Sequence, residues 1–264
     1  MKEETNLAHL LLQSDPDHDD RPAVATRVRV IDSHLEQPVH SHRKGQLVVS
    51  LHGGVTCEVP DALWIAPPHY GVWVPGGVDH RSRATDNARI CFLLIEPGAL
   101  DMPAECCTVK IAPMIREMIQ HLVDQGLDYP RNGRTARLVS VLLEQLSTAP
   151  VEQLKLPISQ HPKLQLIAQT FASECSNRLS LMEWADRMAM SEKTLARLVV
   201  RETGLTFGRW RQRFKLLLAL QLLASGMTVQ RVAGDLGYDS VTAFITMFKK
   251  ALGVSPGKYF SDPT

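Results

Sequence analysis

Residues 232–248, VAGDLGYDSVTAFITMF, indicate the architecture of the C-terminal part of this 264-residue chain. Residues 182–199, MEWADRMAMSEKTLARLV, repeat the same pattern earlier in the chain. Each stretch has an alanine where two helices would cross closely, then a short turn and a serine placed to cap a new helix: Ala185 and Ser191 in the first, Ala233 and Ser240 in the second. Two such stretches predict two similar helix-turn-helix units; a single one would leave a plain helical bundle as an equal alternative.

The two expected second helices have apolar residues on one side only. The inward positions are Leu195, Leu198 and Val199 in the first helix, and Phe244, Met247 and Phe248 in the second. Their opposite faces are left free for DNA. Residues 207–224 join the units without Gly or Pro, and at about 1.5 Å per residue they predict one helix about 27 Å long. The helical repeat of DNA is about 34 Å, so this helix suits two recognition helices in successive major grooves.

Charge is divided unevenly along the chain. Residues 163–264 carry 14 Lys and Arg against 8 Asp and Glu, a balance of 14 − 8 = +6, whereas residues 1–162 carry 15 − 20 = −5. This indicates that the C-terminal part is the one that meets a polyanion. The 5 cysteines form no CxxC pair, no apolar run approaches the roughly 20 residues that span a bilayer, and the polar N-terminus is unlike a signal peptide. We expect a cytoplasmic protein with reduced thiols and no membrane association.

The C-terminal stretch resembles the signature of the AraC family of transcription regulators over residues 163–264. The residues that carry the resemblance are Ala233, Gly237, Tyr238, Ser240, Phe244, Phe248, Lys249, Lys250, Gly253, Ser255, Pro256 and Tyr259, with Glu202, Thr203, Gly204 and Phe207 after the first recognition helix. Two positions depart from it, because Thr246 and Phe260 stand where the family often has Arg. The resemblance implies double-stranded promoter DNA as a partner, RNA polymerase as another if the protein activates, and no enzymatic activity.

The resemblance also assigns roles on the two recognition helices. Base contacts are expected from Lys193, Thr194, Ala196 and Arg197 in the first helix and from Val241, Thr242, Ile245 and Thr246 in the second. Arg197 can donate two hydrogen bonds to O6 and N7 of guanine, worth about 1–3 kcal/mol of discrimination; a surface ion pair with Glu192 or Glu202 is the alternative. Phosphate contacts, which set affinity and register, are expected from Ser191, Arg209, Arg211, Ser240, Lys249, Lys250 and Lys258.

The N-terminal part has a different pattern. Residues 24–96 contain short apolar or alternating runs separated by Gly and Pro, which predicts several short strands in a sandwich or barrel. From Pro113 the apolar period becomes helical, and residues 147–162 contain three prolines and little periodicity. We therefore expect an α+β multidomain chain, with a disordered N-terminus at 1–22, a sensor and dimerisation domain at 23–146, a linker at 147–162 and the DNA-binding domain at 163–264.

A helix around residues 135–146 carries an apolar stripe. Its members recur at helical spacing: Leu138, Val141, Leu142 and Leu146. The stripe predicts a homodimer joined through this helix. Burial of the stripe inside the N-terminal domain is the alternative.

Two short motifs resemble those of cupins. His40-Ser41-His42 with Gln46 matches HxHxxxE, and residues 75–80, PGGVDH, match PxGxxH. The resemblance implies a small cupin-like β-barrel in which His40, His42 and His80 converge, the positions that hold a divalent metal in cupin enzymes. Gln46 replaces the cupin carboxylate, which weakens metal binding. No cofactor is therefore required, although a divalent metal remains a candidate.

We expect these histidines to line an effector pocket rather than to catalyse. The expected pocket residues are His40, His42, Gln46, Trp64, Tyr70, Trp73 and His80, with the aromatic rings as an apolar wall. Capping of strand ends by the histidines is the alternative.

Five further stretches resemble one AraC subgroup, the NimR-type regulators, which control drug-efflux genes: residues 43–47, 55–59, 63–65, 67–69 and 95–98. The leading interpretation is a small-molecule-responsive regulator of a transporter or efflux gene. A cupin metalloenzyme of dioxygenase type with a helical appendage is the alternative from another class. A DNA-binding protein with a purely structural barrel is the third.

Overall fold

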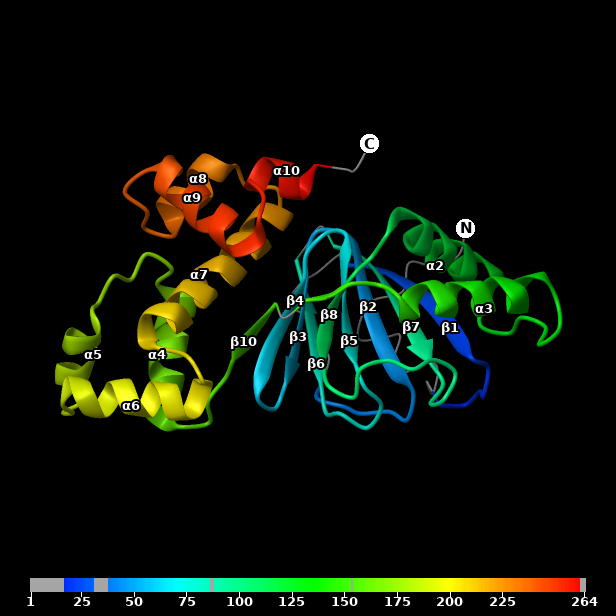
Figure 1. The fold of residues 1–264 in the computed structure, drawn as a ribbon, viewed down its shortest axis with the longest axis horizontal. Coiled ribbons are helices and arrows are strands. Elements are labelled where there is room, and N and C mark those ends of the chain that lie inside the picture. Colours follow the sequence, from blue (N-terminus) through cyan, green and yellow to red (C-terminus); the bar gives the residue numbers. More distant parts are fainter. Residues whose placement is uncertain (1–16, 31–37, 86–87, 153, 262–264) are drawn as a thin grey trace. The chain divides into compact units, whose positions relative to one another are not determined.

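The computed structural model describes residues 17–30, 38–85, 88–152 and 154–261. The chain separates into two compact units, Met1–Pro60 with Trp64–Lys155, and Asp61–Leu63 with Leu156–Thr264 (Figure 1). The expected order, a β-rich N-terminal part followed by a helical C-terminal part, is confirmed. No helix of the described residues has the length and apolar character that crossing a membrane requires.

The strands form two sheets. The larger has the order β1-β7-β2-β5-β8-β9: β1 (Ala23–Arg29), β7 (Arg89–Ile95), β2 (Gly45–His52), β5 (Tyr70–Val74), β8 (Cys107–Lys110) and β9 (Val151–Glu152). The smaller has the order β10-β4-β3-β6: β10 (Lys155–Pro157), β4 (Ala62–Ala66), β3 (Val55–Val59) and β6 (Arg81–Ala84). The strands therefore build two sheets rather than one closed barrel, and an isolated antiparallel bridge pairs His40 with His80.

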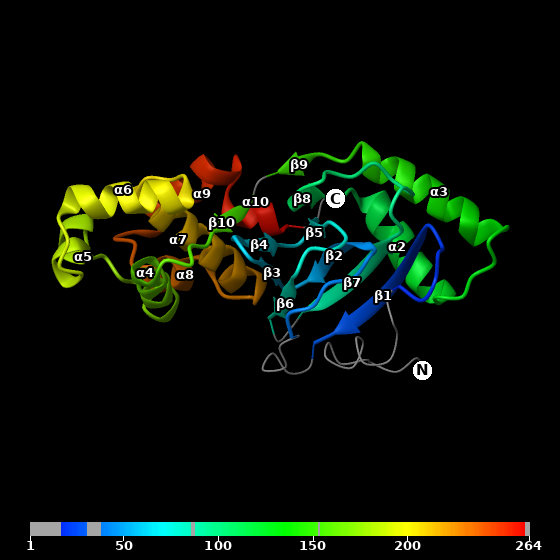
Figure 2. The same ribbon diagram turned by 90° about the horizontal axis from the view of Figure 1, so that it is seen from below.

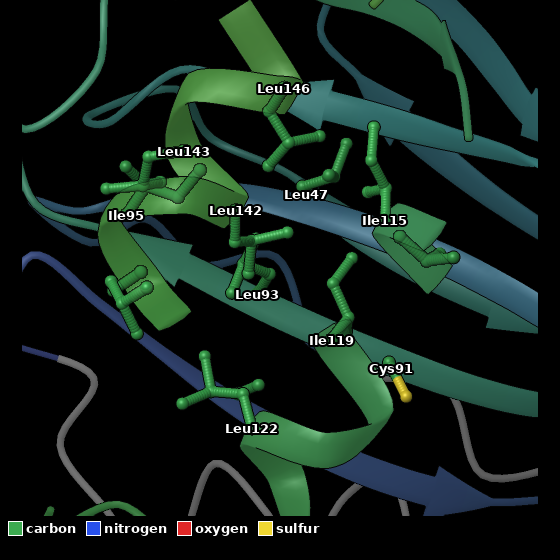
Figure 3. Close-up of a cluster of buried hydrophobic side chains, with 14 of the residues drawn as sticks. Leu47, Cys91, Leu93, Ile95, Ile115, Ile119, Leu122, Leu142, Leu143 and Leu146 are labelled. Atoms are coloured by element: carbon green, nitrogen blue, oxygen red, sulfur yellow. The ribbon is translucent and has the colours of Figure 1, made fainter. Parts of the chain in front are cut away.

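The larger sheet has different neighbours on its two faces. Helices α2 (Pro113–Gln125) and α3 (Arg134–Ser147) cover one face, and β3, β4 and β6 lie on the other side (Figures 1 and 2). Figure 3 shows the core on the helix side. Its buried residues include Leu47, Leu93 and Ile95 from the sheet, Ile115, Ile119 and Leu122 from α2, and Leu142, Leu143 and Leu146 from α3.

This core corrects the interpretation of the apolar stripe on α3. Leu142 is 0% exposed and Leu146 is 2% exposed, because both pack against the sheet of their own chain. Leu138 is partly buried against the same core. Only Val141 of the four presents a large exposed fraction, 42%. The alternative of burial inside the N-terminal domain is therefore correct for Leu142 and Leu146.

The two segments expected to be irregular are partly structured. Residues 1–16 of the expected disordered N-terminus lie outside the described residues, whereas Asp17 accepts hydrogen bonds from the backbone N–H groups of Arg43 (2.7 Å) and Lys44 (3.1 Å). In the expected linker, β9 pairs with β8 and β10 joins the smaller sheet. The boundary between the two compact units falls after Lys155, within that segment.

The second unit is helical. Its elements are α4 (Pro162–Ser173), α5 (Leu181–Arg187), α6 (Glu192–Thr203), α7 (Phe207–Ala224), α8 (Val229–Asp235), α9 (Val241–Leu252) and α10 (Pro256–Phe260). The predicted connecting helix has the bounds of α7, and its predicted length is confirmed. The two predicted caps are also confirmed: the Ser191 hydroxyl accepts from the N–H of Thr194, and the Ser240 hydroxyl from the N–H of Ala243.

Candidate functional site

The second unit contains two helix pairs of the same construction, α5–α6 and α8–α9. The expected inward stripes are buried in both second helices. Each pair turns through a residue with positive φ, Ala189 at 51° and Gly237 at 71°. At Gly237 a Cβ would lie 3.0 Å from the carbonyl oxygen of Ser176, so this turn needs glycine both for its conformation and for space.

The residues expected to contact bases lie on the outer faces of α6 and α9. Lys193, Thr194, Arg197, Thr242 and Thr246 are exposed; Ala196, Val241 and Ile245 are half-buried. Two hydroxyls are already used locally. The Oγ1 of Thr246 donates to the carbonyl of Thr242 (2.9 Å), and the Oγ1 of Thr194 lies 2.7 Å from the Oγ of Ser191. The Thr246 hydroxyl therefore uses its proton within the helix, and an external partner meets its oxygen as an acceptor and its methyl group.

Arg197 has no competing partner in the described part of the chain. Glu202, one of its two alternative partners, instead accepts from Arg201 (2.9 Å) and from the hydroxyl of Ser159 (3.0 Å). No ion pair of the described residues includes Arg197 or Glu192. The guanidinium is thus left for an external acceptor.

The cations expected to contact phosphates differ in exposure and in the contacts they already make. Arg209, Lys249, Lys250 and Lys258 are exposed. Arg211 is half-buried, donates to the carbonyl of Leu179 (3.0 Å) and lies 5.5 Å from the centroid of the Phe207 ring. Ser191 and Ser240 are the caps of α6 and α9, where helix N-termini favour anions.

A cationic cavity of about 470 Å³ lies beside α9. Sequence reasoning missed two of its lining residues, Arg178 and Lys215. Lys215 donates to the carbonyl of Leu236 (2.8 Å), and burial and the neighbouring arginines lower its pKa. Arg178 pairs with Asp239 (2.7 Å). A lysine on an otherwise apolar stretch of α7 is the only signal that could have drawn attention to this cavity.

The first unit brings the three predicted histidines together. The ring centroids of His40 and His80 are 4.4 Å apart, and those of His42 and His80 are 5.1 Å apart. One ligand nitrogen from each ring lies within 4.8 Å of the other two. His42, His80 and Gln46 are buried, and His40 is half-buried.

Each imidazole is oriented by a backbone carbonyl at Nδ1. The pairs are His40 with Pro38 (2.9 Å), His42 with Lys44 (2.6 Å) and His80 with Val78 (2.9 Å). A carbonyl oxygen only accepts hydrogen bonds, so each Nδ1 carries a proton. In a neutral imidazole the Nε2 atom then keeps its lone pair, and it is the Nε2 atoms that converge.

Gln46 lies between two of these nitrogens. Its Nε2 is 3.3 Å from His80 Nε2, and its Oε1 is 3.3 Å from His42 Nε2. An amide supplies donors on one side only, so in either orientation of the amide one Nε2 lone pair faces an oxygen. The Nε2 of His40 is buried and has no hydrogen-bond partner.

Burial disfavours the charged form of two of these histidines, His80 and His40. It lowers the pKa of His80 to about 4, and the neighbouring imidazoles of His40 and His42 act in the same direction. Burial likewise lowers the pKa of His40. Near neutral pH, His40 and His80 therefore present lone pairs rather than positive charge.

Two glycines hold the His80 loop against the segment just before β2 that carries His42. A Cβ on Gly76 would lie 2.0 Å from the carbonyl oxygen of Arg43, so only glycine permits this approach. Gly77 has a φ of 78° and donates its N–H to the carbonyl of His42 (2.8 Å). The PxGxxH spacing thus has a structural cause.

One of the three aromatic residues expected in the pocket lies elsewhere. Trp73 belongs to the core beneath α2 and α3, and its Nε1 donates to the carbonyl of Pro103 (2.9 Å). The expectation that Trp73 shares a pocket with the histidines is therefore wrong. Trp64 is buried with Nε1 lacking a hydrogen-bond partner. The hydroxyl of Tyr70 donates to Glu152 (3.2 Å).

Other polar groups inside the first unit were missed. The hydroxyls of Thr26 and Thr108 are buried without a hydrogen-bond partner. Thr26 pairs with Phe92 and Thr108 with Val72, so alternation along the strands places both on the face opposite α2 and α3. The ammonium of Lys44 is fully buried, lacks a hydrogen-bond partner and lies 4.0 Å from Glu96.

These features define a protein in which a β-rich unit is followed along the chain by two helix-turn-helix units, and comparison with known proteins identifies the family. The model of a helix-turn-helix domain family matches residues 184–262. The HTH-type transcriptional regulator NimR of Escherichia coli (strain K12) is 49% identical over 247 residues, which cover 94% of this chain and 90% of NimR. The chain belongs to the AraC family of helix-turn-helix transcription regulators, and it is a DNA-binding regulator.

Two further similarities are more distant. The probable transcriptional regulator LumQ of Photobacterium leiognathi is 21% identical over 245 residues, which cover 88% of this chain and 95% of LumQ. The structure of ToxT from Vibrio cholerae covers 90% of this chain and 96% of its own, with 10% identity and a TM-score of 0.38. The curated relatives are named as regulators. Family membership therefore favours the regulator interpretation over the cupin-enzyme alternative.

Proposed function

We propose that this regulator binds promoter DNA in the cytoplasm through α6 and α9, and that a small molecule bound in the first unit changes its output. The observation that carries the DNA-binding part is the pair of serine-capped helices with free outer faces on either side of one 18-residue helix. Arg197 reads a guanine, and the exposed cations of α7, α9 and α10 hold phosphates. In this proposal residues 23–146 are the sensor and dimerisation domain, 147–162 the linker and 163–264 the DNA-binding domain.

The effector part of the proposal is supported by unsatisfied polar groups. Buried hydroxyl, amide and amine groups normally have hydrogen-bond partners. The first unit instead has several without one: His40 Nε2, Thr26 Oγ1, Thr108 Oγ1 and Trp64 Nε1. A cupin-like sensor, with an effector between its sheets, would satisfy such groups. A purely structural barrel gives no reason for them.

The gene under control is proposed from similarity. NimR matches 94% of the chain, and the resemblance to the NimR-type regulators implies control of a drug-efflux gene. We therefore propose a transporter or efflux gene as the target. If the regulator activates, RNA polymerase is its further partner.

We retain a homodimer as part of the proposal, but on a smaller surface than the sequence indicated. Val141 is exposed on α3, and Leu138, three residues earlier, is half-buried at the edge of the core. These two residues, rather than Leu142 and Leu146, are the apolar groups that a second copy could cover.

Two experiments test the function. Footprinting of the full-length protein upstream of its own and neighbouring genes should reveal a protected site; no protection at low salt would contradict the DNA-binding proposal. A thermal-shift screen of small molecules tests the sensor, because a ligand of the native state raises the melting temperature. A hit should change promoter output, and this change should be lost in the double variant His42→Ala, His80→Ala while operator binding remains.

A further inference from the structure

We propose that His40, His42, His80 and Gln46 bind one divalent transition-metal ion, and that an open position on this ion binds the effector. The first statement concerns the cluster alone. The second rests on the proposed sensor function. The two are tested separately below.

The convergence of lone pairs carries the proposal. Backbone carbonyls fix the Nδ1 proton on all three rings, which leaves the Nε2 atoms to act as ligands, and one ligand nitrogen of each ring lies within 4.8 Å of the other two. Lone pairs directed at one point repel unless a proton donor or a cation lies between them. Second-shell carbonyl contacts of this kind fix the tautomer and orientation of metal-binding histidines.

Gln46 gives independent support. Its side chain lies 3.3 Å from both His42 Nε2 and His80 Nε2, and its amide can donate to only one of them. A cation near the Nε2 atoms would resolve the conflict, because both the amide oxygen and the facing lone pair would then be ligands. His40 Nε2, which is buried without a partner, would be satisfied by the same ion.

The donor set selects the type of ion. Imidazoles suit Zn²⁺, Ni²⁺, Cu²⁺ and Fe²⁺, whereas Mg²⁺ and Ca²⁺ prefer oxygen ligands. With metal–nitrogen bonds of about 2.1 Å, a six-coordinate ion holds three neighbouring nitrogens about 3.0 Å apart and keeps positions open beside the four protein ligands. The ligand nitrogens, now within 4.8 Å of one another, would move inward by about 1 Å. Rotation of the ring planes about bonds already held at Nδ1 permits such a movement.

The missing carboxylate explains why the ion would serve recognition. Three neutral imidazoles and an amide leave its +2 charge uncompensated, and Asp79 beside His80 is exposed. An anionic or chelating molecule that supplies oxygen ligands would neutralise the charge and complete the coordination shell. The effector class is therefore a small metal-chelating anion or heterocycle.

The metal site is tested on the full-length protein without DNA or effector. After removal of metal with a chelator and dialysis, the protein is titrated with Co²⁺ and the visible d–d absorption is followed. We expect saturation at one Co²⁺ per chain, displaced by Zn²⁺. His42→Ala and His80→Ala should abolish the absorption, whereas the matched control His121→Ala, which removes an exposed histidine of α2, should leave it unchanged.

A gain-of-affinity variant guards against misfolding of the alanine variants. Gln46→Glu restores a carboxylate and should tighten Co²⁺ binding about tenfold or more, through its added negative charge. Absence of stoichiometric binding by the wild type, or equal binding by wild type and both alanine variants, would overturn the site. Unchanged affinity in a folded Gln46→Glu protein would remove Gln46 from it.

The open position is tested with picolinate, a bidentate chelating anion, added to the Co²⁺-loaded protein. A shift of the d–d bands that saturates is expected. No shift would overturn effector coordination while leaving the metal site intact. Conversely, effectors that bind the metal-free protein equally well would support the proposed sensor and refute the role of the ion.

Discussion

Because Arg197 is expected to contact a base and Lys250 a phosphate, their removal should weaken DNA binding in two different ways. Both side chains are exposed in the second unit. Arg197→Ala should weaken binding to the operator by about 1–3 kcal/mol, roughly 5- to 150-fold, and leave random DNA unaffected, because a forked contact to guanine is sequence-specific. Lys250→Ala should weaken both DNAs alike, because a phosphate contact carries no sequence information.

The salt dependence follows from the number of free cations. Of the expected phosphate contacts, Arg209, Lys249, Lys250 and Lys258 are exposed. At about 0.9 per neutralised phosphate, four contacts give a slope of about −3.6 in log K against log salt for each bound chain. Affinity should then fall by about 150-fold between 50 and 200 mM salt, but by only about 40-fold in Lys250→Ala, whose slope is about −2.7.

Fluorescence anisotropy of the full-length protein on labelled operator and scrambled duplexes, at several salt concentrations, measures both effects. Arg89→Ala is the control, since it removes an exposed cation from β7 in the other unit and should change neither value. The role assignment would be refuted if Arg197→Ala and Lys250→Ala lost the same affinity for both duplexes. It would also fail if Arg197→Ala alone reduced the salt slope.

Three further predictions concern stability and assembly. Leu142→Ala should lower the free energy of unfolding by about 2–5 kcal/mol, because it leaves a cavity in the core. Val141→Glu should stay folded and, if α3 joins two copies, should give a monomer by light scattering. A dimer of the Val141→Glu variant would exclude this face as the interface. Gly237→Ala should lower the free energy of unfolding by about 1–2 kcal/mol, because of its left-handed φ and the contact with Ser176. Ala189→Gly should raise it by at most about 1 kcal/mol. Urea denaturation measures both, and a stabilised Gly237→Ala with a destabilised Ala189→Gly would contradict the turn geometry. Gly76→Ala should cost about 1–3 kcal/mol by overpacking against the Arg43 carbonyl and weaken Co²⁺ binding; wild-type values for both would show that the loop needs no glycine.

Sequence predicted the second unit well because its signals are local. A serine before an apolar stripe specifies a helix start whatever surrounds it, and Ser191 and Ser240 both act as caps. The uninterrupted run that became α7 could be placed for the same reason. The HxH and PxGxxH spacings were likewise enough to bring the histidines together, because two glycines leave the backbone little choice.

The failures of prediction all depended on which partner covers an apolar face. The stripe on α3 shows that one side of the helix is buried, but the sequence does not say whether the chain's own sheet or a second copy buries it. Strand β5 is buried at every position, so it has no polar alternation to indicate that Trp73 points toward the helices. Lys44 was missed because a lysine beside an arginine and a glycine is usually exposed, whereas here it is fully buried.

The two recognition helices share one construction but differ in what they can read. The outer face of α6 carries two exposed cations, Lys193 and Arg197, which can donate to guanine. The outer face of α9 carries Val241 and Ile245, and the Thr246 hydroxyl is bonded back to its own helix. Apolar contact favours thymine methyl groups and groove shape over hydrogen-bond readout. Lys249 and Lys250 at the end of α9 then contact DNA phosphates, which carry no sequence information. Most of the sequence information in the operator should therefore lie in the half bound by α6, and the half bound by α9 should tolerate exchange between sequences of similar shape.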